Sequence, residues 1–151
     1  MANSAGICAS FKEDILSGGT AHVFGTDAFK AALYLTSGSL TPATVTSWAS
    51  GTPAGELAAT GNYATGGIAV TLPAAVIASD NLTAIVGATA VWSWSNLTSS
   101  GAFDTVFLYN SSKSNKAVAL FSLGGSQTIT AGTLTLTMPA VGPTTALIQL
   151  A

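Results

Sequence analysis

Hydrophobic residues follow two different spacings along this chain, and the spacing changes near Gly18. Before that position they recur at intervals of three and four, at Ile7, Cys8, Phe11, Ile15 and Leu16. An α-helix turns once in 3.6 residues, so this spacing places all five on one face. The pattern therefore predicts a short N-terminal helix over about residues 5–17.

The polar residues around this helix predict its ends and its solvated side. Either Ser4 or Ser10 is a candidate N-cap, and Ser10 together with Glu13 matches a capping box. Gly18-Gly19 is expected to end the helix. Lys12, Glu13 and Asp14 fall on the face opposite the apolar residues, where we expect solvent.

After Gly19 apolar and polar residues alternate with a period of two, which is typical of strands with one buried face. Residues 29–36 form the first such segment. Further short strands are predicted at 67–72, 75–78, 84–86, 88–95, 103–109, 117–123, 127–130, 133–138 and 146–150. Small polar turns such as 79–81, 99–101 and Gly124-Gly125 separate them.

These short strands predict an all-β fold. We expect an antiparallel β-sandwich, jelly-roll-like, with one short N-terminal α-helix, in a single domain over residues 1–151. Residues 103–109 and 116–123 flank a polar loop and predict a hairpin. Residues 133–138 alternate without a break.

Residues from about 40 to 66 are rich in Thr, Ala, Gly and Pro and break the strand pattern. We expect a long excursion with one or two short strands. Its isolated Trp48 has two interpretations: a hydrophobic plug on the end of the sandwich, or an anchor inserted into a partner, since tryptophan is common at the centre of interfaces.

Trp92 and Trp94 alternate within one predicted strand and therefore project from the same face. One interpretation places both in the sandwich core, because large aromatic side chains are highly buried on average. The other is an exposed aromatic platform for a subunit contact or for stacking on a sugar ring. Trp48, Trp92 and Trp94 are thus the candidate interface residues.

The composition is unusual in its lack of charge. Only 7% of residues are charged, against about 25% in an ordinary globular domain, and the chain has no arginine. A surface of small uncharged side chains packs against another surface with little cost of desolvating ions. We therefore expect a component of an assembly, with copies of itself among its partners.

Charge and hydropathy also exclude some partners. The net charge of −2 provides no basic surface for nucleic acid. Residues 117–151 contain no charged side chain, but glycines and prolines interrupt them, so they do not match the run of about 20 apolar residues that a membrane helix needs. The first residues lack the features of a signal peptide, and we expect synthesis in a cytoplasm-like compartment.

Residues for catalysis are scarce. The only histidine, His22, is a candidate base for Cys8 or a serine, but Cys8 lies in an apolar stripe, where burial leaves a thiol inert. The other interpretation of His22 is a loop or edge histidine near Phe24. The chain also lacks clusters of metal ligands and a phosphate-binding glycine loop. We expect no enzymatic activity, no cofactor and no bound metal.

Four segments resemble the small virion proteins of tailed bacteriophages. They are MANSAGICASFKEDILSG (1–18), FKAALYL (29–35), YNSSKSNKAVALFSLGG (109–125) and TLTLTMP with TTALIQLA (133–139 and 144–151). Among those with an assigned role, the chain most resembles capsid cement or decoration proteins, which are similar in size. The resemblance implies a β-rich fold, a homotrimer and a location on the outer capsid surface. It also implies that the major capsid protein is the partner and that the protein is made in the host bacterial cytoplasm.

Two further functions remain open at this point. One is a head-fibre or receptor-binding module in which a tryptophan stacks on host glycan. The other is a head-completion or tail component with the same sandwich. The resemblance supplies a class of protein and no functional residues.

Overall fold

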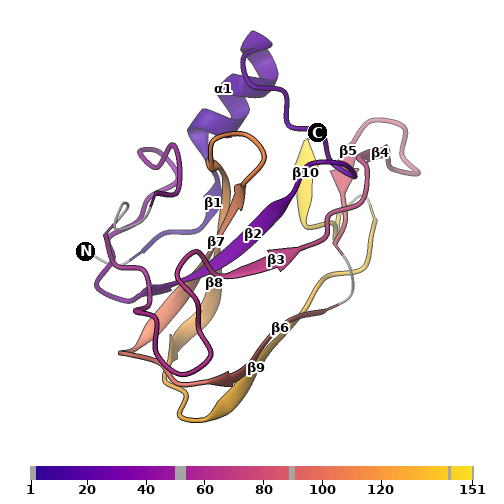
Figure 1. The fold of residues 1–151 in the computed structure, drawn as a ribbon. Coiled ribbons are helices and arrows are strands. Elements are labelled where there is room, and N and C mark those ends of the chain that lie inside the picture. The colour runs from indigo at the N-terminus through magenta and orange to yellow at the C-terminus, as the bar shows by residue number, and fades with distance from the viewer. Residues whose placement is uncertain (1–2, 50–53, 89–90, 143, 151) are drawn as a thin grey trace.

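The computed structural model describes residues 3–49, 54–88, 91–142 and 144–150. These residues form one helix and ten strands (Figure 1). In chain order the elements are β1 (Gly6–Ile7), α1 (Ala9–Ser17), β2 (Phe29–Leu35), β3 (Ile68–Val70), β4 (Val76–Ile77), β5 (Ala84–Val86), β6 (Val91–Leu97), β7 (Phe103–Asn110), β8 (Lys116–Gln127), β9 (Gly132–Thr137) and β10 (Ile148–Leu150).

The strands pair antiparallel throughout, in three sheets. The largest has five strands in the order β1-β8-β7-β2-β3, a second has the order β10-β5-β4, and β6 pairs with β9. The predicted all-β fold with antiparallel sheets and one short helix is confirmed. The predicted hairpin at 103–123 is also confirmed, as β7 and β8.

The five-stranded sheet is covered on both faces, so β7 is buried along nearly its whole length. Successive side chains of a strand point to opposite faces. On one face, Tyr109 stacks against Trp48 of the excursion. On the other, Phe121 of β8 contacts Trp92 of β6 edge to face. The β6–β9 ribbon thus forms the second layer of the sandwich, and the excursion packs on the opposite side.

The helix is shorter than the sequence predicts. Gly6 and Ile7 pair with Leu120 and Ala119 as β1, an edge strand, and α1 begins only at Ala9. Apolar periodicity does not distinguish two strand residues from a first helical turn, and a partner 112 or more positions away leaves no local signal. The predicted end is confirmed, because Gly18 adopts the left-handed conformation with φ of 66°.

The predicted N-caps are wrong. Cys8 occupies the N-cap position with extended backbone angles and makes no capping hydrogen bond through its side chain. Ser10 instead donates from Oγ to the carbonyl of Val45, 3.2 Å away. The serine therefore fastens the helix to the excursion.

Two predictions for later strands are also wrong. Gly124-Gly125 does not end a strand, because β8 continues to Gln127, and no separate strand forms at 127–130. The pairing explains this: Phe103 lies opposite Gln127 and Thr105 opposite Ser122, so residues 123–126 form a bulge against β7. Glycine is common in such bulges, where its freedom at positive φ is used, here 77° at Gly124.

The excursion contains isolated bridges where one or two strands were predicted. Glu56 pairs with Tyr34, Ser47 with Lys116, and Gly61 with Leu97. Residues 50–53 of the excursion, and residues 89–90 of the predicted strand 88–95, lie outside the described residues.

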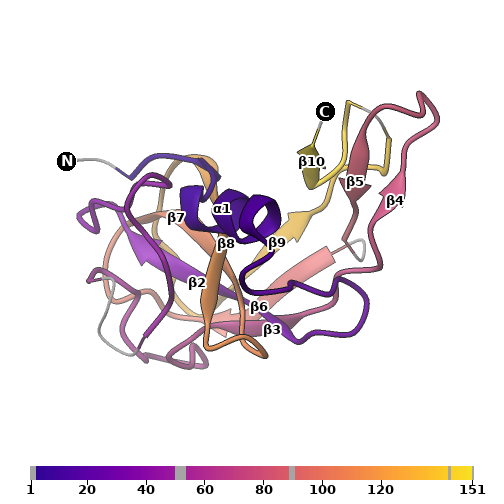
Figure 2. The same ribbon diagram turned by 90° about the horizontal axis from the view of Figure 1, so that it is seen from above.

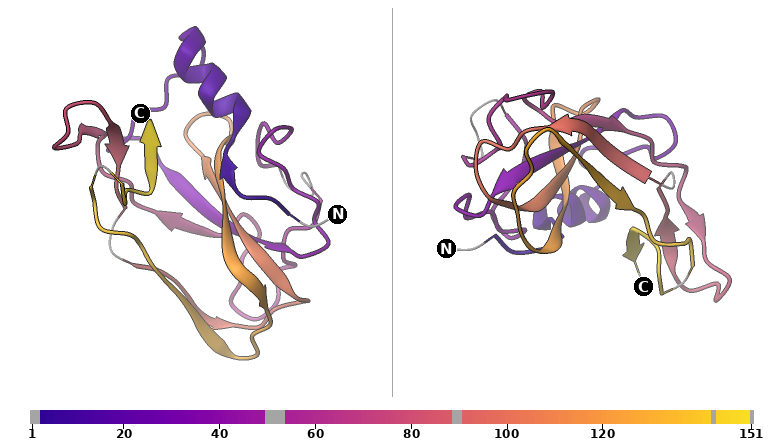
Figure 3. Two further views of the ribbon diagram at one scale, coloured as in Figure 1. Left: turned by 180° about the vertical axis from the view of Figure 1, so that it is seen from behind. Right: turned by 90° about the horizontal axis from the view of Figure 1, so that it is seen from below.

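The small β10-β5-β4 sheet stands to one side of the five-stranded sheet when the molecule is seen from above (Figure 2). Seen from behind, α1 extends above the sheets, and β10 lies in the upper part of the molecule with it (Figure 3). A hydrophobic cluster nevertheless runs from Cys8 in the first part of the chain to Ile148 in β10.

Candidate functional site

Trp92 and Trp94 belong to the core. They are 3% and 4% exposed and face the five-stranded sheet from β6. The core interpretation of these two residues is confirmed, and an exposed aromatic platform is wrong for both. Their indole N–H groups have no hydrogen-bond partner among the described residues, which indicates that packing alone holds them.

Trp48 is partly buried and is held by its own chain. Its ring lies nearly parallel to that of Tyr109, with 5.2 Å between centroids. Its Nε1 donates to Oε2 of Glu56 at 2.9 Å. Trp48 therefore packs against the sheet and the excursion, and use as an anchor in a partner would first break these two contacts.

Glu56 organises this part of the excursion, which the sequence did not reveal. Its other oxygen, Oε1, accepts from the Tyr63 hydroxyl at 2.8 Å and from the backbone N–H of Gly66. Burial is the main cause that raises the pKa of Tyr63, and the charge of the Glu56 carboxylate adds to it. The same two causes, in the same order, raise the pKa of Tyr109 to about 12. Both tyrosines therefore remain protonated donors, and Tyr109 donates to the Gly66 carbonyl.

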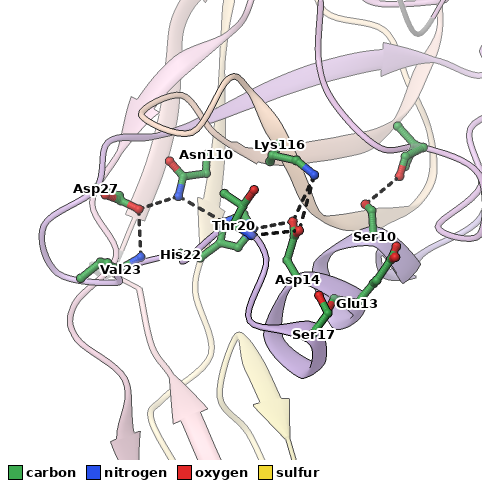
Figure 4. Close-up of polar contacts among 11 residues, drawn as sticks. Ser10, Glu13, Asp14, Ser17, Thr20, His22, Val23, Asp27, Asn110 and Lys116 are labelled. Atoms are coloured by element: carbon green, nitrogen blue, oxygen red, sulfur yellow. Dashed lines mark hydrogen bonds and ion pairs between the residues drawn. The ribbon is translucent and has the colours of Figure 1, made fainter.

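A second polar cluster joins α1, the loop after it and the β7–β8 turn (Figure 4). The side chain of His22 is 1% exposed and lies edge to face against Phe11. Its Nε2 is 3.3 Å from Oδ2 of Asp14, and its Nδ1 is 3.2 Å from Nδ2 of Asn110. The helix pattern predicted a solvated face for Asp14, and this prediction is wrong.

The hydrogen bonds of Asn110 determine which nitrogen of His22 carries the proton. Oδ1 of Asn110 accepts from the backbone N–H of Ser112, and Nδ2 donates to Asp27, so the amide orientation is fixed. Nδ2 must then donate to Nδ1 of His22, and Nε2–H donates to Asp14. Both ring nitrogens are engaged within the fold, which is the environment of a structural histidine.

Asp14 and Asp27 are the charged ends of this cluster. Burial raises the pKa of Asp14, but hydrogen bonds from Thr20 and His22 and the charge of Lys116 outweigh it, so the pKa lies below the ordinary 3.8. Lys116 is 3.4 Å from Asp14, and Lys113 is 3.7 Å from Asp27. The β7–β8 turn is thereby fastened to α1 and the following loop.

Cys8 is fully buried at the start of α1. Burial raises the pKa of its thiol to about 12, although the charge of Lys12 lowers it somewhat. A nucleophilic cysteine must be a thiolate near neutral pH. Cys8 thus behaves as a small core residue, as the apolar stripe predicts.

Seven of the nine large apolar side chains that are exposed among the described residues belong to α1, to the small sheet and its turn, or to the segment that leads into β10. Leu16 of α1 is 87% exposed, Ile77 of β4 is 72% exposed, and Leu82 in the β4–β5 turn is 84% exposed. The turn that presents Leu82 is held by Asp80, whose Oδ1 accepts from the N–H groups of Leu82 and Thr83. The apolar end is defined here by these three residues with Ile15, Val76, Val141 and Leu150.

Most of the few charges are used inside the fold. Seven of the ten charged residues make hydrogen bonds or ion pairs through their side chains: Asp14, Asp27, Glu56, Asp80, Asp104, Lys113 and Lys116. Lys12, Glu13 and Lys30 have no such partner among the described residues. Most charged side chains are thus paired with other parts of the fold, although Asp80 keeps its carboxylate at the surface of the β4–β5 turn.

Comparisons with protein-family models, with curated proteins and with solved structures find no match to this chain. Within the described ranges, no helix is long and apolar enough to cross a membrane. Over those same residues, histidine, cysteine and carboxylate side chains do not gather in groups of three or more suited to a metal ion.

Proposed function

We propose that this protein is a structural component of a tailed-bacteriophage particle, and that it serves as a cement or decoration protein on the outside of the capsid. The observation that carries the proposal is the apolar end. Large hydrophobic side chains there are covered by no described segment of the chain, while most charges are consumed within the fold. Such a surface suits burial in an assembly better than life as a free monomer.

The proposed partner of the small-sheet part of this end is the major capsid protein. A bridge between capsid subunits requires a stiff body and a contact surface with few charged groups to desolvate on docking. The antiparallel sheets supply the body, and Val76 and Ile77 of β4 with Leu82 of the β4–β5 turn supply an apolar contact, in which Asp80 is the one charged residue of the turn. Many such contacts on one shell reinforce one another, since each tethered contact meets its partner at a high effective concentration.

Particles that lack the protein provide the direct test. Purified chain is added to such heads, and occupancy is measured by gel densitometry together with the temperature at which the genome is released. We expect saturable binding in a fixed ratio to the major capsid protein and a higher release temperature. Ile77→Glu should lower occupancy, whereas Thr135→Glu, on the exposed face of β9, should bind like the wild type.

The same measurement addresses the other functions. A head-completion or tail component would be present at only a few copies per particle. A glycan-binding module would bind a carbohydrate array through Trp48, because Trp92 and Trp94 are buried. Either result, with no binding to heads, would overturn the cement function.

A further inference from the structure

The last turn of α1 projects beyond the rest of the molecule (Figures 1 and 3). Phe11, in the first part of the helix, is fully buried, whereas Ile15 is 44% and Leu16 is 87% exposed. The predicted single apolar face is therefore wrong for Leu16, which lies about 140° from Phe11 around the helix. An isolated helix of nine residues is marginal in water and depends on packing for its stability. The exposed turn is thus an apolar surface for which the described chain provides no cover.

Charge flanks this apolar turn on both sides. Successive residues of a helix are about 100° apart, so Leu16 lies about 40° from Lys12 on one side and about 60° from Glu13 on the other. Both charged side chains belong to exposed residues and have no partner in the part of the chain that the structure describes. Leu16 therefore stands between an unpaired positive charge and an unpaired negative charge.

A hollow lies beside the same turn. Lys12, Ile15 and Leu16 line it from α1 and Leu150 lines it from β10, and its volume is about 290 Å³. A cavity of roughly 150 Å³ already accommodates benzene, so this hollow has room for a leucine side chain. Its lining is apolar apart from Lys12.

We propose that α1 is the contact between copies of this chain, with Leu16 of one copy seated in the hollow of the next and Lys12 of one copy beside Glu13 of the other. The inference rests on the proposed function, because it specifies how the subunits of a capsid-bound oligomer hold one another. The occupant is a second copy because one chain carries the projecting leucine, the hollow and both charges of a complementary pair.

The order of the charges determines the arrangement. When two helices pack antiparallel about a twofold axis, equivalent flanks meet, and Lys12 would face Lys12. When helices pack parallel around a rotation axis, opposite flanks meet, and Lys12 faces Glu13 of the neighbour. The contact is then head to tail and closes into a ring, as in the expected trimer.

The first test is the mass of the full chain by sedimentation equilibrium over a range of concentrations. We expect the wild type to self-associate and Leu16→Ser to raise the dissociation constant at least about tenfold, as for a central apolar contact. Val91→Ser, which removes a 49% exposed side chain at the start of β6, is the control and should leave the mass unchanged. A wild type that stays monomeric, or a Leu16→Ser variant that associates normally, would overturn the inference.

A charge exchange provides the second test. Lys12→Glu and Glu13→Lys should each weaken association at low salt, because each places like charges together, and the double variant should restore it. Lys30→Glu, which changes an unpaired charge on β2, controls for net charge. If the double variant associates no better than either single variant, the parallel arrangement is wrong. Circular dichroism and urea melts of each variant verify that the fold is retained.

Failure of this inference is distinguishable from failure of the proposed function. Leu16→Ser monomers that still bind heads would be consistent with both. A wild type that associates through Leu16 but does not bind heads would overturn the cement function alone. A wild type that binds heads but never associates in solution would overturn the α1 contact alone.

Discussion

Glu13 and Asp14 are neighbours in the sequence, yet their side chains have different environments. Glu13 is exposed, and its carboxylate has no partner among the described residues. Asp14 accepts hydrogen bonds from Thr20 and His22 and pairs with Lys116, which is 102 positions away. The expectation of a solvated side is met by Glu13 and is wrong for Asp14, because at about 100° per residue Asp14 lies only about 60° from the buried Phe11, whereas Glu13 lies about 160° from it.

Acid should weaken the fold through Asp14 and Asp27. The pKa of each is below 3.8 in the folded protein, so the folded state resists protonation more than the unfolded chain. The stabilisation is present above about pH 4 and is lost as the pH falls through the folded pKa values. Urea melts between neutral pH and about pH 2.5 should show a falling midpoint.

The variant Asp14→Asn isolates one of these carboxylates. It should lower the urea midpoint at neutral pH, because the ion pair with Lys116 and the charge-assisted bond from His22 are lost. Its further decline in acid should be shallower than that of the wild type, because one titrating group is gone. Parallel curves for the two proteins would contradict the assignment.

At the scale of elements, α1 is held mainly by its first turn. Phe11 is fully buried and contacts both His22 and Phe24. The last turn of the helix extends away from the sheets (Figure 1). The position of the helix therefore depends on one aromatic anchor and on the polar cluster around Asp14.

Phe11→Ala should lower the free energy of unfolding by about 3–5 kcal/mol, as expected for a buried phenylalanine. Leu82→Ala truncates a side chain that is 84% exposed, so it should change the free energy of unfolding by less than about 0.5 kcal/mol. Urea melts at low protein concentration measure both. A loss below about 1 kcal/mol for Phe11→Ala would mean that the helix does not dock through this ring.

Two glycines with positive φ distinguish the effect of backbone strain from that of steric contact. Gly67, just before β3, has φ of 73°, and a Cβ there would overlap the carbonyl oxygen of Ala31 in β2. Gly124, in the β8 bulge, has φ of 77° but open space around it. Both positions penalise other residues for their positive φ, but only Gly67 lies against a neighbouring strand.

Gly67→Ala should destabilise the protein by more than about 4 kcal/mol or prevent folding, because β2 and β3 cannot keep their separation. Gly124→Ala should cost only about 1–2 kcal/mol, the penalty of the left-handed conformation alone. Urea melts of the two variants give the comparison. Equal losses would mean that the close approach at Gly67 relaxes without consequence.

The ion pairs of the molecule lie apart from the small sheet. They gather around α1, the following loop and the β7–β8 turn, whereas the exposed side chains of β4 are apolar and Asp80 is the one charged residue of the adjoining turn. If that sheet binds the capsid, binding is driven by apolar burial and gains little from steering by charge.

Occupancy of heads should therefore depend only weakly on ionic strength. Between about 0.01 and 1 M salt the Debye length falls from about 30 to 3 Å, which suppresses binding that relies on charge. Gel densitometry of heads saturated over this range measures the effect. A steep loss of bound protein as salt increases would contradict an uncharged contact, and the Lys12→Glu variant would show whether α1 supplies the charge.

Local patterns were sufficient for most of the strands, the β7–β8 hairpin, the end of α1 at Gly18 and the buried nature of Cys8. Each follows from the period of the side chains or from the backbone freedom of one residue, and these act over a few positions. They were insufficient for β1, whose two residues continue the helical period but pair with β8, and for the bulge at Gly124-Gly125.

The amino-acid sequence by itself determined the all-β class, the scarcity of charge and the aromatic pair on β6, because these depend on residue type and spacing. Only the tertiary structure decided that Trp92 and Trp94 face inward, that Glu56 holds Trp48, and that His22 lies between Asp14 and Asn110. It also left apolar side chains of α1, β4 and β10 exposed. The physical reason is that burial and pairing are set by contacts between segments far apart in the chain.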